Sequence, residues 1–168
     1  MKTLERLTNI ISAICKVGVG LSFAILIVVV LIQVVGRTAG SSPVWTEELT
    51  RFSLLYLAAF GVGLSFRSGD LVNVDVICES LPGRAPWVLR LISALLTAAV
   101  ALVLIPHAWK FTSIGKMQTS PALGLRMDAV HFTVTLLLAL LFVFAALRVV
   151  NMLSGRSDGL PLKSQEEA

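Results

Sequence analysis

Apolar residues gather in four long blocks, separated by polar segments, at residues 17–35, 52–66, 91–109 and 129–147. The first block holds 19 residues without a formal charge. As a helix it would extend about 28 Å, close to the roughly 30 Å hydrocarbon core of a bilayer. Only helices and closed barrels satisfy their backbone groups in lipid, and no ten-residue alternating segments occur. The pattern therefore predicts an all-α integral membrane protein with four transmembrane helices.

The blocks predict a single membrane domain over residues 1–153, followed by a flexible polar tail over 154–168. The spans are expected at about residues 14–35, 48–66, 88–109 and 129–150. A secretory signal is the competing interpretation of the first block. The apolar centre of such a signal is shorter, about 7–15 residues, and Arg37 beyond the block does not fit a small-residue cleavage site. We expect the first block to remain as a span.

Basic residues in the flanks predict the orientation of the chain. One side carries Lys2, Arg6, Lys16, Arg67, Arg84, Arg90, Arg148, Arg156 and Lys163; the other carries Arg37, Arg51, Lys110, Lys116 and Arg126. The richer side is expected to be cytoplasmic, with both termini. Trp87 and Trp109 lie about 33 Å apart along a helix axis, so they are expected to anchor the third span in the two headgroup layers.

The connections carry helix and turn signals. Ser42 and Pro43 are typical of a helix start, and predict a short outer helix that runs into the second span. The apolar residues within 67–86 predict a helix lying in the inner interface. Proline and glycine within 110–128 predict turns.

Composition and charge exclude several classes of protein. The chain is 56% hydrophobic and 14% charged, a composition that excludes a disordered chain. The net charge is only +4 and no basic residues cluster, so the sequence offers no binding surface for nucleic acid. No formal charge lies deep in a span, which argues against ion-coupled transport by this chain alone. Cys15 and Cys78 have no CxxC spacing and are expected to be reduced and inert. No constellation indicates a catalytic, cofactor or metal site, so no enzyme is predicted.

A polar cluster at the start of the second span is the strongest local feature: Trp45, Glu47, Glu48 and Arg51. Glu47 precedes Arg51 by four residues, the favourable order for a pair on one helix. Both glutamates also lie near a helix N-terminus, where negative charge is favoured. Local capping is one interpretation. The other is a polar contact with a partner subunit, in which Arg37 takes part.

His107 and His131 lie near the outer ends of the third and fourth spans. Two facing imidazoles can hold haem in a helical bundle, so a redox-complex anchor subunit is the alternative class of function. A free-standing small transporter or assembly factor is a third class. Small residues at four-residue spacing predict seams where helices approach closely: Gly18 with Ser22, Ala59 with Gly63, and Ser93 with Thr97 and Ala101.

Three segments between residues 21 and 150 resemble one transporter family. They are WTEELTR at 45–51, FRSGDLVNVD at 66–75 and TSPALGL at 119–125, in order between the four spans. The chain is similar to the small, DctQ-type membrane subunit of tripartite ATP-independent periplasmic (TRAP) transporters. Leu71 stands where members often carry histidine. The resemblance makes Asp75 a further candidate for partner contact.

The resemblance implies that three proteins of the bacterial inner membrane and periplasm act together in transport. A large polytopic subunit would carry sodium and an organic anion such as a carboxylate, moving as an elevator. A periplasmic substrate-binding protein would deliver the substrate. The small subunit, surrounded by membrane lipids, would brace the static scaffold of the large one, with no cofactor of its own.

Overall fold

A computed structural model describes residues 2–41, 43–68 and 85–155. The described chain forms four long helices: α1 (Lys2–Thr38), α2 (Trp45–Ser68), α4 (Ala85–Ile114) and α5 (Met127–Leu153). A short 3-10 helix, η1 (Gly115–Met117), follows α4. All four long helices are long and apolar enough to cross a membrane. The prediction of an all-α protein with four spans is therefore confirmed.

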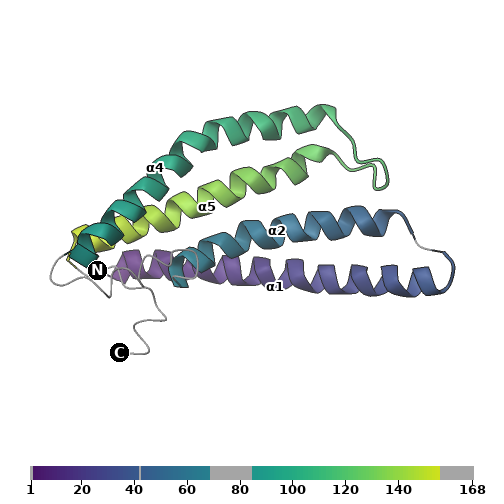
Figure 1. Cartoon of the computed structure of the whole chain (residues 1–168), viewed down its shortest axis with the longest axis horizontal. Coiled ribbons are helices and arrows are strands. Elements are labelled where there is room, and N and C mark those ends of the chain that lie inside the picture. The colour runs from purple at the N-terminus through teal and green to yellow at the C-terminus, as the bar shows by residue number, and fades with distance from the viewer. Residues whose placement is uncertain (1, 42, 69–84, 156–168) are drawn as a thin grey trace.

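The helices pair as two hairpins that lie side by side. α1 packs against α2, α4 packs against α5, and contacts between α2 and α5 join the hairpins. Figure 1 shows the resulting row, with α2 and α5 in the middle and α1 and α4 at its edges. We call the end where α1 begins and α5 ends the terminal end. The opposite end, where described loops join α1 to α2 and α4 to α5, is the connecting end.

The core lies where α1, α2 and α5 meet, and it is built from Cys15, Phe66, Phe144 and Ala145. Small residues bring these helices together. A Cβ added at Gly18 would lie 2.7 Å from the Phe60 ring, and one added at Gly63 would lie 2.7 Å from the Phe144 ring. Glycine at these two positions leaves the space that a neighbouring aromatic ring occupies. Two of the predicted seams, on α1 and α2, are thus confirmed.

The buried face of α4 differs from the predicted seam. Its buried residues are Arg90, Ala94, Ala101, Ala108 and Thr112. Of the predicted Ser93, Thr97 and Ala101, only Ala101 is fully buried. The Thr97 hydroxyl donates to the Ser93 carbonyl oxygen at 2.8 Å, so its polarity is satisfied within its own helix. Alanines seven residues apart provide the close approach instead.

The outer surface of the row is strongly apolar. Along α1, Val17 is 70% exposed, Leu21 is 61% exposed and Val35 is 64% exposed. Such side chains are stable against lipid or against another apolar helix, but not against water. The surface of α1 therefore suits a membrane interior.

The described connections partly follow the sequence prediction. α2 begins at Trp45, and no separate short helix precedes it among the described residues 39–41 and 43–44. Residues 118–126 form turns as predicted, with Gly124 at a φ of 65° and an isolated antiparallel bridge between Thr119 and Arg126. Three parts of the prediction lie outside the described residues: Ser42, the tail from residue 156, and residues 69–84 of the segment 67–86 that predicts an interfacial helix. This last part contains Leu71, Asp75 and Cys78.

Candidate functional site

Glu48 ties the two hairpins together at the connecting end. Its carboxylate accepts hydrogen bonds from the Ser120 hydroxyl, from the Leu123 backbone N–H at 3.2 Å and from the Ala122 backbone N–H at 3.3 Å. All three donors belong to the loop between η1 and α5. Bonds to an ionised acceptor are stronger than neutral ones. Glu48 therefore fixes the start of α2 against this loop.

The loop is shaped to present these donors. The Gly124 N–H donates to the Ser120 carbonyl oxygen at 3.0 Å, which closes a turn over the three residues between them. Gly124 adopts a left-handed φ of 65°, a conformation that glycine reaches without steric cost. The Ser120 N–H donates to the Leu125 carbonyl oxygen at 2.8 Å. The turn therefore holds adjacent backbone donors toward α2.

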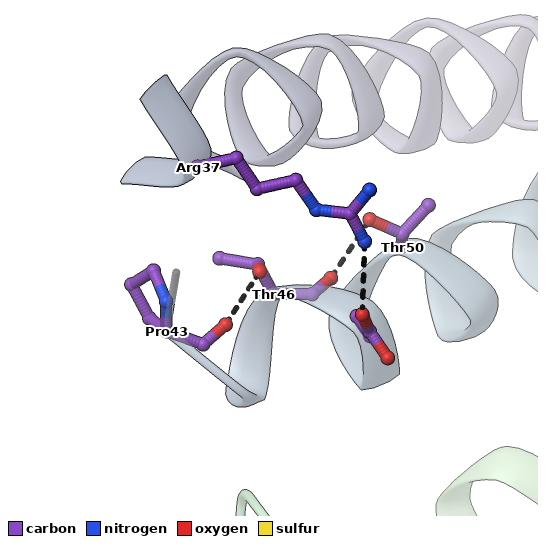
Figure 2. Close-up of polar contacts among 5 residues, drawn as sticks. Arg37, Pro43, Thr46 and Thr50 are labelled. Atoms are coloured by element: carbon purple, nitrogen blue, oxygen red, sulfur yellow. Dashed lines mark hydrogen bonds and ion pairs between the residues drawn. The ribbon is translucent and has the colours of Figure 1, made fainter. Parts of the chain in front are cut away.

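Glu47 connects the two helices of the first hairpin. Arg37, at the end of α1, donates to the Glu47 carboxylate at 3.3 Å, and Figure 2 shows its side chain extended toward the start of α2. The sequence predicted an i, i+4 pair with Arg51 instead. Among the described residues, the ion pair of Glu47 is made with Arg37. Arg37, at the end of α1, thus lies close enough to Glu47 to pair with it in place of Arg51, which lies on the same helix as Glu47.

Thr46 shapes the start of α2. It is fully buried, and its hydroxyl donates to the Pro43 carbonyl oxygen at 2.6 Å. The Thr46 backbone N–H donates to the same oxygen at 3.2 Å. One turn later, the Thr50 hydroxyl donates to the Thr46 carbonyl oxygen at 2.8 Å (Figure 2). These bonds fix the entry of the chain into α2 after Pro43.

Trp45 and Arg51 remain open toward a cleft of about 550 Å³. The cleft is lined by Val44, Trp45, Glu47, Glu48, Arg51, Pro121 and Ala122. Arg51 is exposed, whereas both glutamates already bind residues of this chain. An exposed guanidinium beside an aromatic and a proline side chain suits a polypeptide that carries a carboxylate and an apolar side chain. Of the predicted contact residues, Arg37, Glu47 and Arg51 are exposed, Trp45 and Glu48 are half-buried, and Asp75 lies outside the described residues.

The two histidines have separate local contacts. The His131 ring stacks on Phe111 with 4.1 Å between ring centroids, and its Nδ1 lies 3.3 Å from the Phe111 carbonyl oxygen. His107 is exposed, with Nδ1 at 3.1 Å from the Val103 carbonyl oxygen of its own helix. Within the described part of the chain, no group of three or more His, Cys, Asp or Glu residues could hold a metal. Trp109 is 57% exposed and Trp87 is half-buried near the start of α4, so their anchoring role stays a prediction.

Three polar contacts between helices were not predicted. The Tyr56 hydroxyl of α2 donates to the Ala129 carbonyl oxygen of α5 at 2.7 Å. The Thr112 and Thr135 hydroxyls meet at 2.9 Å between α4 and α5. At the terminal end, Arg67 donates to Ser12 and to Asn9. In the sequence, each of these contacts is marked only by a hydroxyl, amide or guanidinium group in or beside an apolar block. Such a group does not show which residue on another helix it will bond.

The fold defines a multi-pass membrane component, and its largest polar cluster lies at the start of α2, beside the loop before α5. The family model for the DctQ component of tripartite ATP-independent periplasmic transporters matches residues 26–155. The chain belongs to this family, which confirms the resemblance of the three segments. The match includes Glu48 and the loop that holds it.

Two curated relatives agree with this assignment. The chain is 29% identical over 124 residues to the isethionate TRAP transporter permease protein DctMQ of Oleidesulfovibrio alaskensis, covering 69% of this chain and 18% of that protein. It is 26% identical over 110 residues to a putative TRAP transporter small permease protein of Haemophilus influenzae, covering 65% of this chain and 68% of that protein. The chain thus spans about a fifth of the length of the first relative. Family membership favours a transporter component over a haem-bearing anchor.

Proposed function

We propose that this chain is the small membrane subunit of a sodium-coupled, binding-protein-dependent TRAP transporter for organic anions, and that it braces the static scaffold of a large polytopic subunit. The supporting observation is the distribution of charge in the described helices. Charged side chains lie outside the apolar blocks 17–35, 52–66, 91–109 and 129–147, and the apolar surface of these blocks is widely exposed. Such helices can support a partner, but their apolar blocks offer no formally charged side chain to couple an ion.

The relatives support both the partner and the substrate class. The DctMQ relative carries a segment similar to this chain within a much longer permease, as expected if the segment works beside further membrane helices. Isethionate, named for that protein, is an organic anion. The excess of basic residues at the terminal end supports an inner-membrane orientation with both termini in the cytoplasm.

The helices at the edges of the row supply the bracing surface. α1 packs mainly against α2, and its apolar side chains remain exposed along its length. An elevator mechanism needs one element held still while another crosses the bilayer. Four helices beside the fixed element would widen it and resist its tilting in the membrane.

Reconstitution tests this proposal. Liposomes would contain the large subunit, with the binding protein outside and an inward sodium gradient, either with or without this chain. We expect substrate uptake only when the chain is present, and no uptake by the chain alone. Full uptake without the chain contradicts the bracing role. Replacing the sodium gradient with a potassium gradient tests the coupling ion separately.

Arg51→Ala should weaken co-purification with the large subunit or the docked binding protein by about fivefold or more, the loss expected when an interface residue that contributes to binding is truncated. Glu47→Ala should weaken it too, because Glu47 lines the same cleft. Affinity purification from membranes followed by quantitative mass spectrometry measures the ratio of the subunits. Lys110→Ala is the matched control, since Lys110 is exposed near the same end but is absent from the cleft lining. Unchanged ratios for both variants would limit these residues to local contacts.

A further inference from the structure

A second cavity lies at the terminal end, between α1 and α2. Its volume is about 560 Å³. It is lined by Asn9, Ser12, Ala13, Lys16, Leu64, Ser65, Arg67 and Ser68. The lining thus combines two cations with hydroxyl and amide groups, and it contains no carboxylate. This composition suits an anion that accepts several hydrogen bonds.

Arg67 is held in this cavity by neutral partners. Its guanidinium donates to the Ser12 hydroxyl and to the Asn9 side-chain oxygen, the latter at 3.1 Å. Ser12 is 3% exposed, so the contact lies inside the α1–α2 packing. A guanidinium has five N–H donors, and these two bonds leave others available in a fixed orientation. Among the described residues, the hydrogen-bond partners of Arg67 are therefore neutral, and they hold its guanidinium in a fixed position.

Lys16 adds a second cation on the facing helix. It is exposed, and within the described part of the chain no carboxylate forms an ion pair with it. The carboxylates whose side chains the structure describes, Glu47, Glu48 and Asp128, all lie at the connecting end. Among the described side chains, the two formal charges that line the cavity are therefore both positive.

The position of the cavity identifies the source of the anion. Lys16 directly precedes the uncharged block 17–35, and Arg67 directly follows the block 52–66. Both cations therefore lie where the helices leave the hydrocarbon core, at the depth of lipid phosphates. Val17 and Ile14, 70% and 60% exposed, offer apolar surface beside the cavity for an acyl chain. We propose that this cavity binds the phosphate of an anionic phospholipid, with Arg67 and Lys16 as its cationic contacts.

Lipid titration of the full chain tests this site without any transport assay. The purified chain in detergent would be titrated with phosphatidylglycerol and followed by native mass spectrometry. Lys16→Gln should weaken binding about fivefold, the effect of one basic residue near an anionic lipid surface. Lys116→Gln is the matched control, since it removes one exposed lysine at the connecting end and should leave binding unchanged. Arg67→Lys, which keeps the charge but loses the planar donor fork, should weaken binding by a similar factor.

Repeating the titration with other ligands distinguishes a lipid phosphate from free phosphate. Phosphatidylcholine should bind more weakly than phosphatidylglycerol, because its headgroup has no net negative charge. Inorganic phosphate should compete only at a large excess, because it lacks acyl chains. The proposal is overturned by equal binding of the two lipids, by inorganic phosphate binding as tightly as lipid, or by a Lys116→Gln loss as large as that of Lys16→Gln. Unchanged binding by Lys16→Gln overturns it as well.

Discussion

Gly63→Ala should lower the melting temperature of the purified chain in detergent by several degrees. The added Cβ would lie 2.7 Å from Cε2 and 2.8 Å from Cδ2 of Phe144, well inside van der Waals contact. Phe144 is 3% exposed and packs in the core between α2 and α5, so its ring has no free space to enter. Overpacking of this kind costs about 1–3 kcal/mol. Circular dichroism at 222 nm measures the melting of the helices.

Gly61→Ala is the control for this change. Gly61 lies two residues earlier in α2, and nothing lies within 4 Å of a Cβ added there. Alanine is the better helix former, so this variant should melt at or slightly above the temperature of the unmodified chain. Adding Phe144→Leu to Gly63→Ala should recover part of the loss by making room for the new methyl group. Equal melting temperatures for the two alanine variants would show that α2 and α5 do not pack as closely as the structure places them.

The sequence predicts four membrane-spanning helices correctly because lipid excludes charge. No side chain within a block carries a formal charge, so the blocks are recognised one by one as apolar segments. The glycines also predict close packing correctly at Gly18 and Gly63, because a missing side chain leaves room for an aromatic ring from the next helix. Both predictions rest on the properties of single segments.

The sequence does not predict which face of a span meets its neighbour. In a membrane, lipid is as apolar as the protein core, so hydrophobicity does not distinguish the two sides of a helix. On α4 the structure buries Ala94 and Ala108, whereas the hydroxyl-bearing Ser93 and Thr97 are only half-buried. The serine–threonine spacing marks a polar stripe, but their hydroxyls can be satisfied by carbonyls of the same helix.

The sequence also does not predict which residues the glutamates of the polar cluster pair with. Glu47 and Arg51 have the spacing of a helical pair, yet the structure pairs Glu47 with Arg37 across the loop between α1 and α2. Glu48 binds Ser120, which lies 72 residues away. The spacing of charges along one helix cannot reveal a contact that depends on how two hairpins dock. A distant pairing of this kind becomes visible only when the helices are placed together.

Glu48→Gln should release the loop at residues 120–123 from α2 while leaving the four helices intact. The glutamine amide keeps one oxygen acceptor but replaces the second with an NH₂ donor. Ser120 and Leu123 donate to Oε2 alone, so the amide oxygen should take that position and the NH₂ group should face the Ala122 N–H, which now also bonds Oε1. The bond to Oε1 is lost and the bonds that remain go to a neutral acceptor, which binds more weakly than a carboxylate, so the loop should be held less firmly at the start of α2.

Hydrogen exchange measured by mass spectrometry reports this release directly. The amides of Ala122 and Leu123 should exchange on the order of tenfold faster in Glu48→Gln, as expected when local protection by hydrogen bonds is lost. Glu47→Gln is the matched control, because Glu47 pairs with Arg37 and makes no bond to this loop. Exchange in the interior of α5 should not change in either variant. Equal exchange of the two loop amides in the Glu48→Gln and Glu47→Gln proteins would mean that the loop is held by its own turn and not by α2.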